Sequence, residues 1–440
     1  MRKILFLLGL LLPVQLHAQL EWPEITREAK PWTRWWWLGS AVDSANLTRE
    51  LEELARVGFG GVEVTSIYGI KGQEDRHIPY FSDRWIAMLG HAAAEANRLG
   101  MGLDMPPGSG WKMGGPEVPL ELASRSLRFV ADTAPSGAVT WSVEIRNNNE
   151  QVKRPAPGGE GNVVDVLSEK AVAAYFDYFG GKLERPPEGI VRSFFHDSYE
   201  YSGDGSAELF DFFAERRGYD LREYAAALAG EGDPETVARV RSDYRQTMDE
   251  MLLEHLIGPF TDWAHQHGSL TRNQAHGSPG NILDLYAASD IPETEIFGPL
   301  DGSDADPLIS KFASSAAHVA GKPRASAESM TWLGEHWTVS LNDVKQAVDG
   351  LFVSGINHVF FHGTAYSPDD ATWPGWLFYA STQFNDRNAF WRDIPALNQY
   401  IARVQSVMQS GVPDNDVLLY WPIWDNWHDA AGRRPRMDFR

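Results

Sequence analysis

One order of elements repeats over most of the chain: a short apolar run, a turn, and an amphipathic helix that ends near a glycine. This alternation predicts parallel strands, because parallel neighbours need a long crossover between them, usually a helix. Eight such strands close a barrel, so the sequence predicts an α/β fold of the (β/α)8 type. The predicted strands are residues 34–39, 61–66, 101–105, 191–195, 270–274, 294–297, 325–327 and 358–361.

An open doubly wound sheet shows the same alternation and is the alternative fold. Such sheets commonly carry a glycine-rich dinucleotide fingerprint or a P-loop after a strand, and neither pattern follows any of the predicted strands. The barrel therefore remains the favoured prediction. The predicted helices are residues 47–57, 83–99, 207–216, 235–265, 308–319, 341–353 and 390–408.

Two parts of the chain depart from the repeat. Residues 122–187 contain an alternating run at 139–145 and several prolines, which predicts a β-rich insertion carried on a barrel loop. A strand-like run at 416–420 follows the last predicted helix. We expect the catalytic barrel to occupy residues 19–425, and residues 426–440 to begin a following region that is cut short.

The first 18 residues have the pattern of a secretory signal peptide. Arg2 and Lys3 precede an apolar run, and small residues lead to Ala18. That run is too short to cross a bilayer, and no later stretch reaches the roughly 18 apolar residues that a membrane helix needs. We expect an exported protein, periplasmic or extracellular, with no membrane span and, since it lacks cysteine, no disulfides.

Charge and aromatic content restrict the partners. The formal net charge of −21 would repel a polyanion, so no nucleic-acid partner is expected. The chain has 17 Trp and 14 Tyr, and aromatic rings stack well on the faces of sugars. A large aromatic core is the ordinary alternative explanation for the same composition.

Carboxylates follow several predicted strands, where a barrel collects its catalytic groups. Glu200 follows the apolar strand at 191–195, and Glu328 follows the small-residue strand at 325–327. Glycoside hydrolysis needs two carboxyl groups, one to protonate the leaving oxygen and one to activate water or attack carbon. Glutamates also cap helices and pair with arginines, so each position has a structural alternative.

Glu293 and Glu295 are two residues apart and would face the same side of an extended strand. They predict either a catalytic element or, with Asp290, a Ca²⁺ site built from oxygen ligands; a loop that separates them is the alternative. His276 and His362 are expected to hydrogen-bond sugar hydroxyls or to be satisfied core residues. No His-Glu-x-x-His pattern is present, so a zinc site is not indicated.

Seven runs spread over the chain carry a family likeness: PWTRWWW at 31–37, FHDSYE at 195–200, RNQAHGSP at 272–279, IPETE at 291–295, SAE at 326–328, WLGEH at 332–336 and FFHGT at 360–364. On these runs the sequence resembles the bacterial α-L-rhamnosidases of glycoside hydrolase family 106. The resemblance implies a TIM-like barrel followed by β-sandwich domains, inversion of anomeric configuration, dependence on Ca²⁺, and release of terminal α-L-rhamnose from plant polysaccharides or other rhamnosides.

The same resemblance implies roles for single residues. Glu200 and Glu328 match the catalytic pair, with Glu200 as general acid and Glu328 as general base, although the reverse order stays open. Glu295 matches a third essential acid near the metal, and Glu293 is its expected neighbour there. The residues expected to contact a rhamnose-containing substrate are Trp36, Trp37, Asp197, Asn273, His276, Trp332, Glu335, His336 and His362.

Two other functions remain open at this point. A retaining glycosidase for another sugar would hold its two carboxyl groups roughly 5 Å apart, whereas an inverting enzyme needs roughly 6.5 to 9.5 Å. A barrel that binds sugar without chemistry would show thermal stabilisation by the sugar and no hydrolysis.

Overall fold

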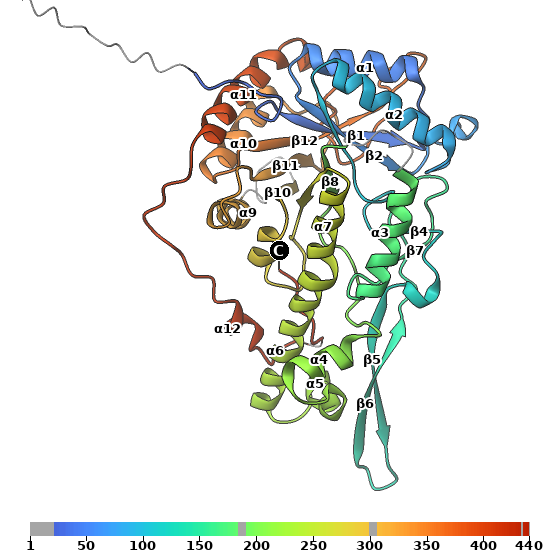
Figure 1. Ribbon diagram of the computed structural model, residues 1–440, viewed down its shortest axis with the longest axis vertical. Helices are drawn as coiled ribbons and strands as arrows, with labels where there is room; N and C mark the ends of the chain where they lie inside the picture. Colours follow the sequence, from blue (N-terminus) through green and yellow to red (C-terminus); the bar gives the residue numbers. More distant parts are fainter. Residues whose placement is uncertain (1–21, 184–190, 299–305, 433, 440) are drawn as a thin grey trace, which may run out of the picture.

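The computed structural model describes residues 22–183, 191–298, 306–432 and 434–439. Eight parallel strands form one sheet in the order β3-β2-β1-β12-β11-β10-β9-β8, and a parallel bridge between Met105 and Phe194 joins its two edges. The predicted (β/α)8 barrel is therefore confirmed, with helices around the sheet (Figure 1). The signal peptide predicted at residues 1–18 lies outside the described residues. The barrel strands are β1 (Trp32–Leu38), β2 (Gly61–Ile67), β3 (Gly102–Asp104), β8 (Ser193–His196), β9 (Leu270–Asn273), β10 (Ile291–Gly298), β11 (Ser326–Trp332) and β12 (His358–Ala365).

Local sequence signals begin several of the helices. The side chains of Asp43 and Ser82 accept hydrogen bonds from backbone N–H groups of the first turns of α1 and α2, and Ser340 forms a capping box with Asp343 at α10. No helix in the described ranges is long and apolar enough to cross a membrane. The helices are α1 (Ser44–Arg56), α2 (Asp83–Arg98), α3 (Glu169–Leu183), α4 (Leu209–Arg217), α5 (Ala225–Ala229), α6 (Pro234–Met251), α7 (Gly258–Gln266), α8 (Ile282–Ala287), α9 (Pro307–Val319), α10 (Leu341–Val353), α11 (Ile394–Ser410) and α12 (Ile423–Trp427).

The long helix predicted at 235–265 is present with one irregularity. A π-helical turn at Leu252–Ile257 joins α6 to α7. Pro259 follows this turn, and proline lacks the N–H that a regular helix would use at that position. The predicted extent of this helix is therefore confirmed, and the proline accounts for the local change in its winding.

Residues 122–187 contain both an inserted unit and a barrel helix. Strands β5 (Arg125–Thr133) and β6 (Val139–Asn147) form an antiparallel hairpin that projects from the body of the molecule (Figure 1). The helix α3 then contacts α7, so it belongs to the helical layer of the barrel. The inserted unit thus ends before α3 rather than at residue 187. The short strands β4 (Gly114–Gly115) and β7 (Asn162–Val163) pair beside it.

The prediction of a strand-like segment at residues 416–420 is wrong. This segment is extended and exposed, and Leu418 is 87% accessible to solvent. It has no strand to pair with in the barrel sheet, because every strand of the closed barrel already has two neighbours. The residues that follow do not lead away from the barrel. Phe439 exchanges backbone hydrogen bonds of 2.7 and 2.9 Å with Gly277 and Ser278, which lie on the loop after β9.

Trp32 fills the amino-terminal end of the barrel. A side chain at Gly61 or Gly102 would collide with its indole ring, so the neighbouring strands must carry glycine at these two positions. The guanidinium of Arg192 stacks on the other side of the indole, 3.7 Å from the ring centroid. The indole of Trp32 therefore closes the amino-terminal end of the barrel, below the charged residues in the barrel interior.

His358 packs against Trp32 and predicts a pH effect on stability. Burial and the charges of Arg192, Arg324 and Arg272 lower the pKa of His358 well below its usual value. Below pH ~6.5 the unfolded chain binds a proton at this residue while the folded chain does not, so the free energy of unfolding falls as the pH falls. In His358→Gln we expect that dependence to be shallower between about pH 6.5 and pH 5, by up to about 1.4 kcal/mol per pH unit in urea titrations.

The matched control is His428→Gln, which changes an exposed histidine near the end of α12. An identical pH slope for His358→Gln and the unmodified chain would mean that His358 gains its proton equally in both states.

Candidate active site

The middle of the barrel holds a buried ion network. Arg272 on β9 lies within hydrogen-bonding distance of Glu63 and Glu293, at 2.9 Å for Glu293, and 3.4 Å from Asp104. These carboxylates come from β2, β10 and β3, so the contacts span the barrel interior. Burial lowers the pKa of Arg272 to about 9, which leaves it charged at neutral pH. The network forms a rigid charged floor below the carboxyl ends of the strands.

Arg34 lies above this floor and connects it to the mouth of the barrel. Its guanidinium is 2.9 Å from Glu63, 3.1 Å from Glu328 and 3.4 Å from Asp197. The side chain is only 4% exposed, which is costly for a cation unless carboxylates surround it. Sequence reasoning missed this residue. A lone arginine inside the aromatic run of β1 is the signal that marks it.

Glu328 is held by four side chains at the mouth. Its Oε2 accepts from Arg34 and from Gln274 Nε2 at 2.9 Å, and its Oε1 accepts from Thr331 Oγ1 at 2.7 Å. Nε2 of His362 lies 3.5 Å from Oε1. Burial alone would raise the pKa of Glu328, but the charge of Arg34 and these hydrogen bonds lower it to about 2. The carboxylate is therefore ionised at neutral pH and oriented by fixed donors.

Glu295 is directly opposite Glu328 on the neighbouring strand, since the two are register partners between β10 and β11. Burial raises the pKa of Glu295 well above its usual value, and the charges of Glu328 and Asp197 raise it further. Its Oε1 is 3.2 Å from Nε2 of His276. The surroundings of the two adjacent carboxyl groups thus shift their pKa values in opposite directions, downward for Glu328 and upward for Glu295.

The loop after β8 supplies two more carboxyl groups. Burial raises the pKa of Asp197 to about 7, in spite of Arg34, and Glu328 adds to the rise. Glu200 is one third exposed, and its oxygens are 2.6 and 2.8 Å from Nζ of Lys153. Its charge acts on both Asp197 and Glu295. The structure therefore brings all three predicted catalytic glutamates to one mouth, together with Asp197.

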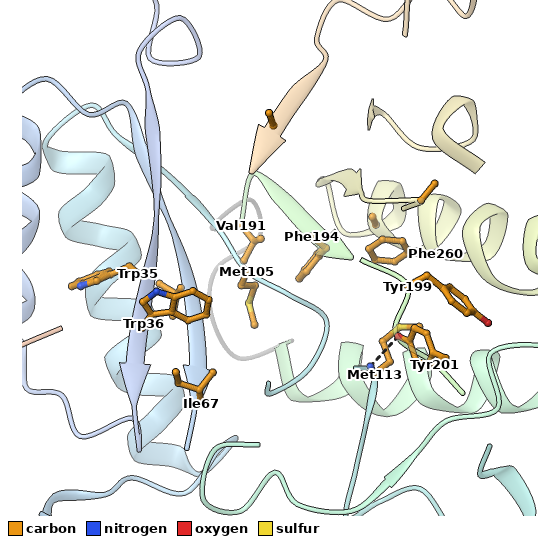
Figure 2. Packing of buried hydrophobic residues seen from close by; sticks show 14 of the residues in the cluster. Trp35, Trp36, Ile67, Met105, Met113, Val191, Phe194, Tyr199, Tyr201 and Phe260 are labelled. Atoms are coloured by element: carbon orange, nitrogen blue, oxygen red, sulfur yellow. Dashed lines mark hydrogen bonds between the residues drawn. The ribbon is translucent and has the colours of Figure 1, made fainter. Parts of the chain in front are cut away.

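Hydrogen bonds fix this loop from below. The hydroxyl of Tyr201 accepts from the backbone N–H of Met113 at 3.1 Å (Figure 2). The same hydroxyl lies 3.2 Å from Nε2 of His196. Nδ1 of His196 is 2.9 Å from Oδ1 of Asn273, so the ring donates to Asn273 and accepts from Tyr201. Burial lowers the pKa of His196 to about 4, so the ring is neutral and structural.

The loops after β8 and β9 also lie against each other. The backbone N–H of Tyr199 donates to the carbonyl of His276 at 2.7 Å. Gly277 has φ +82, and a Cβ there would collide with the carbonyl oxygen of Tyr199. Only glycine combines this conformation with such a close approach. Glu200 and His276 are thereby held next to each other.

Aromatic rings pack beside the acidic centre, where Trp36, a predicted sugar contact, is fully buried. Trp36 stacks on Phe378 and Trp111 with ring centroids 4.2 and 5.7 Å apart, and its indole meets the ring of His362 at 4.8 Å. Nδ1 of His362 donates to the carbonyl of Ala380 at 2.7 Å. Burial lowers the pKa of His362 to about 4, so this ring is neutral at pH 7.

Two of the predicted sugar contacts are wrong because of strand alternation. Trp37 is fully buried and packs against Trp85 of α2, which places it in the helical layer. Asn273 also faces outward, since its Nδ2 donates to the carbonyl of Leu285 on α8. The inward neighbour of Asn273 is Gln274, which contacts both Glu293 and Glu328.

The loop after β11 carries the remaining predicted sugar contacts. Trp332 is 7% exposed and packs into the hydrophobic cluster at the end of β11. Glu335 is exposed, and His336 is half-buried with Nδ1 3.5 Å from Nε2 of Gln383. These three residues lie on one loop at the rim of the mouth, and none of them is seen to contact the carboxyl groups of Glu328, Glu295 or Asp197.

Glu293, one of the two predicted calcium ligands, is committed to protein partners in this structure. Both oxygens of Glu293 are already occupied, one by Ser326 and Arg272 and the other by Gln274. Among the described residues, no group of three or more His, Asp or Glu side chains is arranged to hold a metal ion. Glu293 is thus a partner of Arg272 in the buried ion network.

Comparison with known proteins identifies the family. A family model of α-L-rhamnosidases matches residues 24–147 and 143–427. The chain belongs to glycoside hydrolase family 106. The likeness seen in its sequence motifs is thereby confirmed, and the matched residues of this family 106 chain include every acid of the mouth.

The individual proteins that this chain resembles carry different names. A protein of Formosa agariphila that carries the name of a beta-glucuronidase is 26% identical over 533 residues, which cover 95% of this chain and 45% of the relative. A rhamnosidase structure from Novosphingobium sp. PP1Y matches with a TM-score of 0.71 and 16% identity, over 88% of this chain and 60% of that one. A β-galactosidase from Halorubrum lacusprofundi matches with a TM-score of 0.51, 12% identity, and 87% and 58% coverage. The family 106 chain thus spans about half the length of its curated relative, and the structural matches support the barrel fold alone.

Proposed function

We propose that this protein is an inverting glycosidase that releases terminal α-L-rhamnose from plant polysaccharides or other rhamnosides. The observation that carries the proposal is the meeting of carboxyl groups at one barrel mouth, where Arg34 and fixed donors hold Glu328 ionised and Glu200 comes from the loop after β8. Glycoside hydrolysis needs two carboxyl groups, one as acid and one as base or nucleophile. Membership of family 106 supports rhamnose as the sugar.

Glu328 is the proposed general base. Its low pKa keeps it ready to accept a proton from water, and fixed donors hold both of its oxygens in place. Glu295 is the register partner of Glu328 on the neighbouring strand, so we place it beside the base rather than across the sugar from it. Its raised pKa favours the protonated form, which can donate to a sugar hydroxyl.

Glu200 is the proposed general acid. It comes from the loop after β8, which is separated from β11 by two other strands of the barrel. Inversion requires about 6.5 to 9.5 Å between the carboxyl groups, so that a water molecule fits beside the sugar. Glu200 pairs with Lys153 in this structure, so we expect the leaving group to displace Lys153 when it meets Glu200.

Two parts of the proposal concern calcium and location. The requirement for Ca²⁺ that the family resemblance implies stays a prediction, and hydrolysis measured with and without a chelator tests it. Export likewise stays a prediction of the first 18 residues.

A panel of nitrophenyl glycosides tests the sugar specificity. We expect hydrolysis of the α-L-rhamnoside and none of the β-D-galactoside. The β-D-glucuronide belongs in the panel, because the Formosa agariphila relative carries that activity in its name. Cleavage of the glucuronide without the rhamnoside would overturn the proposal. Stabilisation by rhamnose without cleavage of any glycoside would indicate a sugar-binding barrel.

A further inference from the structure

Two consecutive cations lie beside the acidic mouth, on the segment between β6 and β7. Lys153 pairs with Glu200. The guanidinium of the next residue, Arg154, lies among three aromatic rings, 4.3 Å from the centroid of Tyr379, 5.7 Å from Trp111 and 5.9 Å from Tyr68. This arrangement is an aromatic cage around a half-buried cation.

The cage holds Arg154 without giving it a counter-ion. Among the described residues no carboxylate lies within ion-pair distance of its guanidinium, although the chain carries 60 acidic residues against 39 basic ones. Guanidinium groups at partly buried sites generally pair with carboxylates, which match their fork of donors. Arg154 therefore keeps donors available for an anion from outside the chain.

The backbone at Arg154 is also held in an uncommon conformation. Its φ of +55° lies in the left-handed region, which disfavours residues other than glycine. The backbone N–H of Trp111 donates to the carbonyl of Lys153 at 3.3 Å, and a Cβ at Gly110 would collide with that carbonyl. Such strain persists where the surrounding structure imposes it, and it is concentrated at functional sites.

A chain of contacts places Arg154 relative to the reacting centre. Trp111 of the cage stacks on Trp36, Trp36 contacts His362, and His362 lies next to Glu328. On the other side, Lys153 touches Glu200. A general acid stands beside the oxygen of the leaving group. The two cations therefore lie toward the sugar or other group that leaves, and the rhamnose itself lies deeper, toward Glu328.

We propose that Lys153 and Arg154 bind an anionic group on the leaving part of the substrate, either the carboxylate of a uronic acid or a sulfate ester. This proposal rests on the proposed rhamnosidase function and specifies its substrate. The anion supplies the missing counter-ion of Arg154. It also competes with Glu200 for Lys153, which frees the carboxyl group of Glu200 to meet the leaving oxygen.

The test compares charged and neutral substrates that are otherwise matched. One pair is an α-L-rhamnosyl uronic acid disaccharide and its methyl ester, and a second pair is a rhamnosyl disaccharide with and without a sulfate on the leaving sugar. For the unmodified chain we expect a higher kcat/KM on a charged member than on its neutral counterpart. In Arg154→Gln we expect that preference to fall at least tenfold, and in Arg154→Lys to fall by less.

Arg146→Gln removes a cation from the exposed hairpin strand β6 and should leave the preference unchanged, so it controls for net charge. A preference for only one charged pair identifies the anion as carboxylate or sulfate. Equal loss on charged and neutral substrates in Arg154→Gln would overturn the proposal and assign Arg154 to packing. Failure of the unmodified chain to cleave any rhamnoside would instead overturn the proposed function, so the two failures are distinguishable.

Discussion

Glu328→Gln is expected to lower kcat/KM on an aryl α-L-rhamnoside by about 10²- to 10⁴-fold, the range that a general base contributes. Glutamine keeps the size and polarity of the side chain but cannot accept a proton from water. The hydrogen bonds from Gln274 and Thr331 to this position show how closely the carboxylate is oriented. Nitrophenol release at saturating and subsaturating substrate gives kcat and KM separately.

The matched control is Glu215→Gln on α4, which changes an exposed glutamate and should leave the kinetics unaltered. Arg34 retains Glu63 and Asp197 as partners in Glu328→Gln, so the barrel should stay folded, and circular dichroism checks this. A loss of less than tenfold in a folded variant would remove Glu328 from the role of base.

Arg272→Met is expected to have the largest effect on stability. The substitution removes the guanidinium shared by Glu63, Asp104 and Glu293. Glu63 keeps Arg34 and Asp104 keeps Arg192, whereas Glu293 stays buried without the arginine that pairs with it. Breaking a buried ion pair by removing one partner costs about 3–5 kcal/mol, because the remaining charge stays desolvated. Urea unfolding should therefore show a free energy of unfolding lower by that amount, or a chain that no longer folds.

Arg222→Met serves as the comparison, since Arg222 is exposed and pairs with Asp220 at the surface. An exposed pair of this kind contributes less than about 1 kcal/mol. If Arg272→Met were no more destabilising than Arg222→Met, the central ion network would not support the barrel.

The barrel and its acids could be predicted from the sequence because both depend on local pattern. Alternation of strand and helix is a property of neighbouring residues, and the carboxyl ends of parallel strands must share one mouth. Glu200, Glu295 and Glu328 were therefore expected together, and the structure places them together. Their chemical roles remain proposals that the kinetic experiments test.

It was harder to predict which side chains of a strand point into the barrel and which point to the surrounding helices. Successive residues of a strand point to opposite sides, so a register error of one residue exchanges the interior for the helical layer. Trp36, Trp37 and Asn273 were all assigned to the mouth. Trp37 and Asn273 face the helical layer, whereas Trp36 and Gln274 face the barrel interior. The alternation of polar and apolar residues is weak on these strands because both of their faces are buried.

Contacts between distant segments could not be predicted from local pattern at all. Arg34 meets Glu328 across 294 positions of sequence, and the segment that carries Lys153 reaches Glu200 only through the folded insertion. Buried charge is costly in a barrel core, so its concentration here is consistent with a fold that retains such groups for chemistry. The arginine inside the aromatic run of β1 was the one clue in the sequence.

The most direct test of the account follows the hydrolysis of an aryl α-L-rhamnoside by proton NMR from the first turnover. The account predicts that rhamnose is released and that the β anomer appears first, before mutarotation produces the α anomer. First appearance of the α anomer would contradict single displacement by water. Absence of rhamnose release from the folded chain would contradict the proposed function itself.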